Sequence, residues 1–401
     1  MYQRELVGEL ARRIEEPRKF IQIVIGPRQT GKTTAVEQAM AKTQQVVYFA
    51  SADDPLAVSG DWIKSEWAAA RSLALGPQSD GGTGALLVID EIQKIENWSA
   101  YVKLLWDEDA RNDINLRVVL TGSSTLMLRK GMNESLMGRF EVLYSTHWSF
   151  EECRDAFGYS LEDFLYYGGY PGSASLIGQG KRWMDFMRDA IVEPTISLDV
   201  LQMESVQKPA LLRSLFLLGT SYSAQELSLT KIMGQLQDAG STATLAHYLE
   251  LLGKAGMLCG LEKYSPQLVR SRKSSPRFMT FDTSLMSFST ASQRGRLESD
   301  PSWKGHLVES AVGAYLLARS KSEGFTVQYW RDRGNEVDFV LKKGNQLTCI
   351  EVKSGRVKSL DGVAAFKKRY PEANSLVIGG SSRSLEDFLL GKYPLFSLYE
   401  A

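Results

Sequence analysis

The chain has 401 residues, of which 43% are hydrophobic, and its 47 basic and 47 acidic residues give a formal net charge of zero. This length predicts two to three domains, and the balanced charge excludes a global basic field for nucleic acid. We expect no membrane partner, because no apolar run is long enough to span a bilayer, and no secretion signal, because residues 1–10 are charged and amphipathic. Three well-separated cysteines without a C-x-x-C favour a cytoplasmic protein over a zinc or disulfide framework.

The first predicted elements are a strand and a helix joined by a glycine loop. Residues 20–25 form an apolar, β-branched run that predicts a buried strand, and residues 33–42 favour a helix. Between them, residues 26–33 read G-P-R-Q-T-G-K-T and fit the phosphate-binding pattern G-x-x-x-x-G-K-[ST]. This order aims backbone N–H groups and a helix N-terminus at a phosphate. An ordinary glycine turn is the alternative interpretation.

The loop predicts a nucleotide site in which each residue type has a role. We expect Gly26 and Gly31 to take positive φ and admit the ligand closely. Lys32 would reach the β- and γ-phosphates as a catalytic cation, and the Thr33 hydroxyl would bind Mg²⁺. The predicted nucleotide-binding residues are Gly26, Pro27, Arg28, Gln29, Thr30, Gly31, Lys32, Thr33 and Thr34.

Two further strands end in polar residues. Residues 85–89 form an apolar run that leads into Asp90 and Glu91, and ligands of parallel sheets lie beyond the carboxyl ends of the strands. We expect Asp90 to hold Mg²⁺ through water and Glu91 to polarise the attacking water; solvated turn residues are the alternative. A third strand, residues 116–120, runs into Ser123, which would touch the γ-phosphate or the water, or else cap the helix near residue 125.

These motifs together resemble a known family. With Gly138-Arg139-Phe140 and the segment 167–171 (YGGYP), they are similar to bacterial and archaeal AAA-type ATPases whose poorly characterised C-terminal domain is related to restriction-endonuclease-like nucleases. The resemblance implies an α/β fold with a P-loop AAA-type core, a parallel sheet with helices on both faces, ATP and Mg²⁺ as ligands, and a homo-oligomer. It also implies that Arg139 is a catalytic arginine finger that acts across a subunit boundary. A structural ion pair is the alternative role for Arg139.

Four regions are predicted along the chain: the ATPase core (1–148), a helical lid or linker (149–205), a winged helix (206–282) and a C-terminal mixed α/β nuclease-like domain (283–401). Capping boxes at Ser149 and Ser160 begin helices in the second region.

In the third region, the sequence predicts one helix at 208–218, a second after a cap at Ser223, and a third at 245–254 that residues 241–244 open. Two strands, at 257–261 and 277–281, follow. The third helix would offer side chains to a major groove. These side chains are Thr242, Thr244, His247 and Tyr248. The basic segment 263–277 would neutralise phosphates or form a solvated loop.

The C-terminal region carries a second group of charged residues. Two strands, 337–341 and 347–353, flank a turn at 343–346, and a symmetric turn would place Asp338 opposite Glu351. Facing carboxylates repel each other, and a divalent cation would offset that repulsion. Asp338-x12-Glu351-x-Lys353 resembles the signature of PD-(D/E)XK nucleases, and Glu309 matches their additional glutamate. The resemblance implies a second Mg²⁺ or Mn²⁺ here; a polar sheet face with a Glu336–Lys353 pair, or an inactive relic, is the alternative.

The leading functional hypothesis is an oligomeric ATP-hydrolysing, DNA-binding protein that acts on branched or broken DNA, with metal-dependent cleavage left open. The preference for branched DNA comes only with the resemblance. The alternative is a signalling or scaffolding ATPase that binds protein partners and carries an inactive nuclease-like domain.

Overall fold

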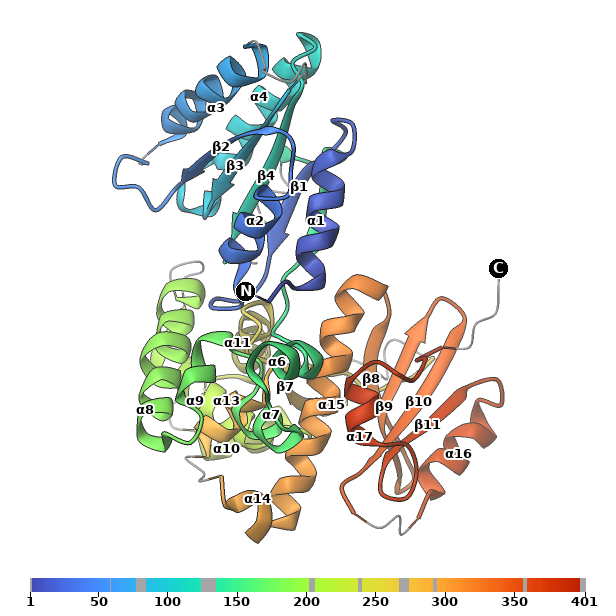
Figure 1. The fold of residues 1–401 in the computed structure, drawn as a ribbon. Helices are drawn as coiled ribbons and strands as arrows, with labels where there is room; N and C mark the ends of the chain where they lie inside the picture. Colours follow the sequence, from blue (N-terminus) through green and yellow to red (C-terminus); the bar gives the residue numbers. More distant parts are fainter. Residues whose placement is uncertain are drawn as a thin grey trace. The chain divides into compact units, whose positions relative to one another are not determined.

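Figure 1 shows the computed structural model of the chain, which describes residues 2–57, 59–76, 84–123, 135–201, 206–236, 240–266, 274–290, 294–355 and 359–396. The chain divides into two compact units, Met1–Thr146 and His147–Ala401. Within the described ranges, no helix has both the length and the apolar character that crossing a membrane would need.

The first unit is built on a five-stranded sheet, in the order β2-β3-β4-β1-β5, in which all the paired strands are parallel. Its strands are β1 (Ile21–Ile25), β2 (Val46–Ser51), β3 (Ala85–Asp90), β4 (Leu116–Gly122) and β5 (Phe140–Tyr144). Its helices are α1 (Glu5–Glu15), α2 (Lys32–Met40), α3 (Gly60–Leu75) and α4 (Trp98–Arg111), with a short 3-10 turn η1 (Ile92–Lys94). The α/β class and the parallel sheet predicted from the sequence are therefore confirmed.

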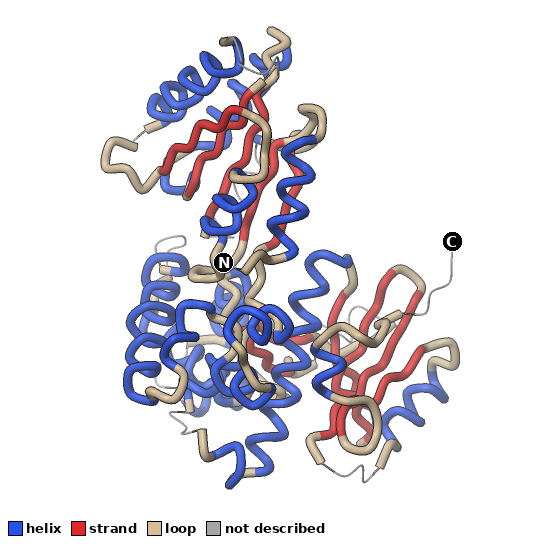
Figure 2. Tube along the Cα trace, viewed as in Figure 1, coloured by secondary structure: helices blue, strands red, loops and turns tan. Residues whose placement is uncertain are grey.

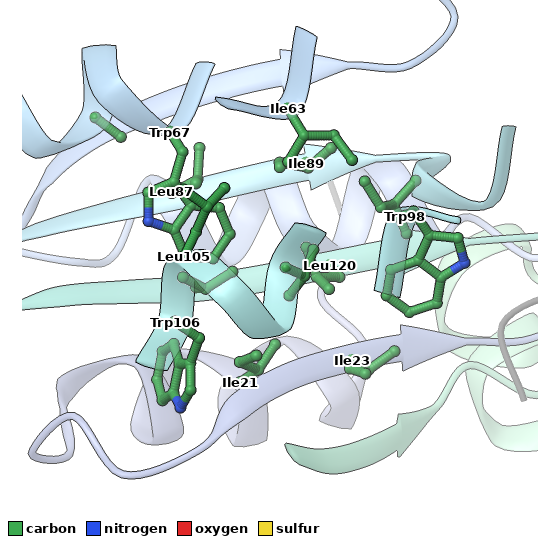
Figure 3. Close-up of a cluster of buried hydrophobic side chains, with 14 of the residues drawn as sticks. Ile21, Ile23, Ile63, Trp67, Leu87, Ile89, Trp98, Leu105, Trp106 and Leu120 are labelled. Atoms are coloured by element: carbon green, nitrogen blue, oxygen red, sulfur yellow. The ribbon is translucent and has the colours of Figure 1, made fainter. Parts of the chain in front are cut away.

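Helices cover both faces of this sheet. Successive side chains of a strand point to opposite faces, so Ile21 and Ile23 of β1 lie in the core under α3 and α4, and Val24 lies in the core under α1 and α2. Figure 3 shows the first of these cores, where Trp67 of α3 and Trp106 of α4 cover the strands. Burying a large apolar side chain contributes about 1.5–3 kcal/mol, and both faces of β1 and β3 are buried along their whole length.

The carboxyl ends of the central strands meet at one edge of the sheet. Ile25, the last residue of β1, pairs with Gly122 of β4 on one side and Tyr144 of β5 on the other. Ile89 of β3 pairs with Leu120 of β4. The glycine loop after β1, the acidic residues that end β3 and Ser123 after β4 are therefore neighbours, as expected for a parallel sheet.

The second unit begins with two helices whose starts are fixed by capping serines. Ser149 and Ser160 each accept the backbone N–H of the third residue of the helix that follows, and the acidic side chains of Glu152 and Asp163 bond back to the cap. Both predicted capping boxes are confirmed. The helices of this part are α6 (Phe150–Phe157), α7 (Leu161–Tyr167), η2 (Pro171–Leu176), α8 (Gly180–Phe186) and the π-helical segments η3 (Met187–Val192) and η4 (Thr195–Val200).

Three helices and a β-hairpin follow, in the order expected for residues 206–282. They are α9 (Pro209–Ser221), α10 (Leu229–Gln235), α11 (Thr242–Lys254) and the antiparallel strands β6 (Leu258–Leu261) and β7 (Arg277–Thr280). The cap predicted at Ser223 is wrong: Ser228 caps α10, and the Ser223 hydroxyl accepts the backbone N–H of Thr280 instead. The predicted opening of the third helix at residues 241–244 is confirmed, because Ser241 caps α11 and Thr242 is its first helical residue.

The C-terminal part is built on a mixed four-stranded sheet, whose strands are drawn in red in Figure 2 and labelled in Figure 1. The strand order is β11-β10-β9-β8. Its strands are β8 (Thr326–Asp332), β9 (Asn335–Lys343), β10 (Gln346–Lys353) and β11 (Asn374–Gly379), and the helices beside it are α15 (Pro301–Glu323), α16 (Asp361–Arg369) and α17 (Leu385–Leu389). Before α15 the chain forms α13 (Thr283–Ser289), which packs on α7 and α9, and α14 (Arg296–Ser299). The β9–β10 pairing runs from Lys343 opposite Gln346 to Phe339 opposite Ile350. The predicted symmetric turn is therefore confirmed.

A bulge in β9 breaks the strict alternation that the sequence argument assumes. Gln328 of β8 pairs with Val340 and Trp330 pairs with Val337, so two residues of β9 stand opposite Tyr329 alone. Val337 and Val340 consequently lie in the same apolar cluster, beside Phe366 of α16. One of the two bulged residues is Asp338, and such irregularities commonly redirect side chains near functional sites.

Candidate nucleotide site and C-terminal charge cluster

The glycine loop closes tightly on the end of β5. Gly31 has φ 80° and precedes α2, which begins at Lys32. The positive φ expected at Gly26 is wrong; this glycine is needed because a Cβ there would lie 1.9 Å from the carbonyl oxygen of Ser145. The second left-handed residue of the loop is Gln29, with φ 60°, which the sequence pattern did not indicate. The loop is thus shaped by one close approach and two left-handed residues.

The loop and the acidic pair are joined through hydroxyl groups. Lys32 is buried, and its Nζ donates to the carbonyl oxygen of Pro27 at 2.6 Å. The hydroxyl of Thr33 donates to Oδ2 of Asp90 at 3.2 Å, and Thr121 donates to Oδ1 of the same carboxylate. Asp90 and Thr33 therefore present hard oxygen ligands side by side. This is the donor type that Mg²⁺ prefers, with phosphates and water completing the coordination.

Glu91 is held by its neighbours in an uncommon conformation. Its φ is 52°, in the left-handed region that non-glycine residues rarely occupy. Its Oε2 accepts the Ser123 hydroxyl at 2.8 Å and also the side-chain amide of Gln93, and its backbone N–H donates to Thr121. Ser123 therefore contacts the carboxylate that the sequence assigns as the base. Thr121 and Gln93 were not predicted, although Thr121 immediately precedes the Gly122-Ser123 pair that was.

Arg4 also belongs to this site and was not predicted. Its side chain is buried, with 7% exposure, and Nη1 donates to the carbonyl oxygen of Thr30 at 3.1 Å and to the hydroxyl of Ser145 at 3.2 Å. Nη2 donates to the carbonyl oxygen of Thr146 at 3.1 Å. One guanidinium thus ties the glycine loop to the end of β5. No sequence signal marks it, because an arginine before an amphipathic helix is ordinary.

Arg139 lies at the other edge of the sheet. It precedes β5, and its carbonyl oxygen accepts the N–H of Ile21, the first residue of β1, at 2.8 Å. The strand from Ile21 to Ile25 spans about 13 Å at roughly 3.3 Å per residue, so Arg139 stands a strand length from its own glycine loop. Its Nε and Nη2 bind both oxygens of Asp107 at 2.7 and 3.0 Å, and this pairing lowers the pKa of the Asp107 carboxyl.

The predicted DNA-facing residues of α11 are only partly accessible. Thr242 and His247 are exposed and Thr244 is half-buried. Tyr248 is buried, and its hydroxyl accepts the backbone N–H of Lys208 at 3.1 Å, so its assignment to a major groove is wrong. Residues 267–273 of the predicted basic segment lie outside the described residues.

The C-terminal acids are brought together, but their partners differ from the prediction. Asp338 follows the hairpin register toward Glu351, and its Oδ2 accepts the N–H of Val352 at 2.8 Å. Lys353 binds Glu351 at 2.6 Å and not Glu336, so the Glu336–Lys353 pair of the alternative interpretation is wrong. The bulge at residue 338 removes the simple alternation on which that pairing depended.

A buried arginine completes this cluster. Arg277, from β7, donates to the carbonyl oxygen of Asp338 at 3.0 Å and to its carboxylate at 3.2 Å, and also binds the Glu336 carboxylate. Glu309 of α15 and Glu351 stand near the same charges: burial, reinforced by the Asp338 carboxylate, raises the pKa of Glu309 to about 8 and that of Glu351 to about 7. Within the described residues, no three Asp, Glu, His or Cys side chains are arranged to hold a metal. The cluster as it stands therefore does not fit the second cation that the sequence predicts.

Comparisons with known families show which kind of domain the first unit contains. Residues 18–154 match the model of an AAA domain, AAA_14. Residues 18–154 form an AAA-type P-loop ATPase domain. Two further models match the rest of the chain, each described as a domain of unknown function: DUF8612 over residues 158–294 and DUF4143 over residues 304–390.

Individual relatives are distant. An uncharacterized protein of Methanocaldococcus jannaschii is 24% identical over 274 residues, which cover 64% of this chain and 58% of that protein, less than two thirds of its length. A Walker-type ATPase of Pyrococcus abyssi has a TM-score of 0.45 and 14% identity, over 72% of this chain and 96% of that one. A variant of RuvB from Thermotoga maritima has a TM-score of 0.33 and 16% identity, over 65% of this chain and 86% of that one.

The contacts of Arg4 with Thr30, Ser145 and Thr146, here called the Arg4 clamp, give a first prediction. Replacing Arg4 with Leu keeps an apolar stem but leaves the carbonyl groups of Thr30 and Thr146 without these donors, and losing a buried charged hydrogen bond costs about 1.5–3 kcal/mol. We expect a lower melting temperature and an ATP affinity weakened by roughly tenfold or more, measured by calorimetry. The control is Arg12→Leu on α1, where the side chain is 60% exposed. Unchanged ATP affinity in a folded Arg4→Leu protein would contradict the clamp.

Proposed function

We propose that this protein is a Mg²⁺-dependent ATPase that hydrolyses ATP as a homo-oligomer. Two hydrogen bonds support the proposal most directly: Thr33 to Asp90 and Ser123 to Glu91. They bring the P-loop and the ends of three strands into one constellation, where a nucleotide phosphate would meet a cation, a carboxylate base and a hydroxyl group.

Each residue has a role that follows from its place. The backbone N–H groups of residues 26–34 receive the phosphates, and Lys32 exchanges its bond to Pro27 for the β- and γ-phosphates. Thr33 and Asp90 would hold Mg²⁺, which neutralises phosphate charge when bound. Glu91 orients and polarises the attacking water, and Ser123 holds that carboxylate in place.

Mutations can distinguish the role of Glu91 in hydrolysis from the role of Lys32 in binding ATP. Glu91→Gln keeps the shape of the side chain but lacks the carboxylate that polarises water, so we expect ATP affinity to persist and kcat to fall by about 10²–10⁴-fold. Lys32→Ala removes phosphate contact and should weaken ATP binding itself. Steady-state hydrolysis and nucleotide binding are measured on both variants.

The control for this pair is Glu96→Gln, an exposed carboxylate a few residues along the same loop. It should leave both measurements unchanged. Hydrolysis at the wild-type rate by Glu91→Gln would show that another group activates the water.

The position of Arg139 supports oligomeric action. This arginine stands a strand length from its own P-loop, so a finger role requires a neighbouring subunit. To serve there it must leave Asp107, which holds it bidentately. The Arg139–Asp107 pair is partly exposed, and pairs of this kind contribute about 1 kcal/mol or less, a cost that binding a phosphate can offset.

Mixing subunits tests this arrangement. Arg139→Ala and Lys32→Ala are each expected to be inactive alone, and mixed oligomers should regain part of the activity because some interfaces pair an intact P-loop with an intact arginine. Arg111→Ala, an exposed arginine at the end of α4, is the control and should stay active. Verified mixed oligomers without any recovered activity would exclude Arg139 as a finger in trans.

We also propose that the second unit binds DNA, with branched or broken DNA as the preferred form, and that it grips the DNA without cutting it. The order of three helices and a hairpin at 209–280 supports this, as do the basic residues between 263 and 277. Two observations favour the alternative of a protein partner: Lys254 on α11 is paired with Glu250, and Arg277 is buried.

Binding and hydrolysis measurements distinguish the DNA-binding function from the protein-partner function. They use four-way junction, linear and single-stranded DNA. We expect junction DNA to increase ATP hydrolysis several-fold and DNA affinity to fall steeply with salt, as counterion release requires. Hydrolysis and fluorescence anisotropy are measured between about 50 and 200 mM salt. No binding at the lowest salt would leave the protein-partner function, and DNA cleavage in Mg²⁺ or Mn²⁺ would contradict a gripping role.

A further inference from the structure

Strand β2 is an open edge of the five-stranded sheet (Figure 1). It pairs with β3 on one side, and no other strand in the described part of the chain pairs with its outer side. Residues 46–51 read V-V-Y-F-A-S and contain neither a charged residue nor a proline, which commonly protect such an edge. The opposite edge strand, β5, carries Glu141, which binds Arg13. The outer N–H and C=O groups of β2 are therefore open to pairing with another extended chain.

Two apolar side chains of β2 are also left partly exposed. Val46 is 39% exposed and Phe49 is 41% exposed. Their neighbours are better covered, because Tyr48 packs against the core under α3 and α4 and Val47 packs against the core under α1 and α2. Large apolar side chains exposed along one edge commonly mark an interaction surface.

An open cavity of about 520 Å³ lies along this edge. Phe49 and Ala50 both line it, and successive residues of a strand point to opposite faces of the sheet. The cavity therefore crosses the outer edge of β2, where an added strand would run, and does not lie on one face alone. Trp62 and Glu66, from the first half of α3, line it as well. Its volume is in the range of ordinary binding sites.

The charged residues that line this cavity are all acidic, namely Asp53, Asp54 and Glu66. Asp53 is paired with Lys94. Asp54 and Glu66 have no cationic partner among the described residues, and each accepts a neutral donor: the N–H of Leu56 at 2.8 Å and the hydroxyl of Tyr48 at 2.7 Å. The cavity thus holds uncompensated negative charge, which attracts a cation and repels an anion.

We propose that the β2 edge binds an extended, basic segment of a partner protein, which adds a strand to the sheet beside β2 and places a lysine or arginine in the cavity. Main-chain hydrogen bonds to β2 would give affinity, and the cavity would select the side chain. The cation would stack on the rings of Phe49 and Trp62 and bind the carboxylates of Asp54 and Glu66. None of these residues is assigned to the nucleotide, so the inference does not depend on ATP hydrolysis.

Peptide probes test the chemistry of the partner on the full-length protein. The first probe is a labelled seven-residue peptide of alternating threonine and arginine, which favours a strand and presents its arginines on one face. The second has glutamate in place of arginine, and the third has proline in place of threonine, which keeps the charge but removes main-chain N–H groups. By fluorescence anisotropy, we expect the first to bind at least about tenfold more tightly than the other two, because they lose the ion pairs or the ladder.

Variants of the protein locate the binding. Asp54→Asn/Glu66→Gln keeps the shapes and hydrogen-bond acceptors of both side chains, and we expect it to bind the first peptide about fivefold more weakly. The matched control, Glu96→Gln/Asp113→Asn, removes the same charge from two exposed positions outside the cavity and should bind like the wild type. Phe49→Lys places a cation on the edge and should also weaken binding, while sedimentation shows an unchanged oligomeric state.

Three results would overturn the proposal. The first is equal affinity, or no binding, for all three peptides, which would mean that neither charge nor strand pairing is recognised. The second is wild-type affinity in a folded Asp54→Asn/Glu66→Gln protein. The third is dissociation of the oligomer by Phe49→Lys, which would show that a second copy of this chain occupies the edge. Melting curves confirm that each variant is folded, and no readout is ATP hydrolysis.

Discussion

The ATPase domain depends on how closely its glycine loop approaches the end of β5. A Cβ on Gly26 would lie 1.9 Å from the carbonyl oxygen of Ser145, so only glycine permits this contact. Arg4 then binds the carbonyl group of Thr30 on one side and that of Thr146 on the other. The parallel register beside it brings the ends of β3 and β4 to the same edge. Lys32 and Thr33 follow β1, Asp90 ends β3 and Ser123 follows β4, so the site draws on three strand ends that must stay in register.

Both units place a buried charge beside partners of opposite charge or beside hydrogen-bond donors. In the first unit, the buried carboxylate of Asp109 is held by the indole N–H of Trp67 and the guanidinium of Arg71, although burial still raises its pKa. In the second unit, Arg277 does the same for Asp338 and Glu336 with the signs exchanged. The two units differ in the carboxylate oxygens that have no hydrogen-bond partner. Both carboxylate oxygens of Asp109 have hydrogen-bond partners, whereas Oε2 of Glu351 is buried without a hydrogen-bond partner among the described residues.

Local sequence signals predicted much of this protein, and long-range contacts account for what they did not. The strands 21–25 and 85–90, the two capping boxes and the symmetric β9–β10 turn follow from periodicity and turn chemistry, which act between near neighbours. The contacts of Glu91 with Ser123 could be expected once the sheet was known to be parallel. Arg4 and Arg277 could not, because each meets residues tens of positions away and nothing in its surroundings marks it. The bulge at Asp338 had no signal either, so the pairing assumed for Glu336 and Lys353 followed a regular strand that the protein does not have.

The Arg4 bridge has a mechanical consequence. Thr146 is the last residue of the first compact unit, and its carbonyl group shares a guanidinium with the carbonyl group of Thr30 in the loop that would surround the phosphates. Tension that arrives along the connecting chain at Thr146 therefore has two routes, one along the backbone into β5, which ends at Tyr144, and one through the Arg4 side chain to the phosphate loop. In the other direction, a loop that tightens on its ligand pulls on the same anchor.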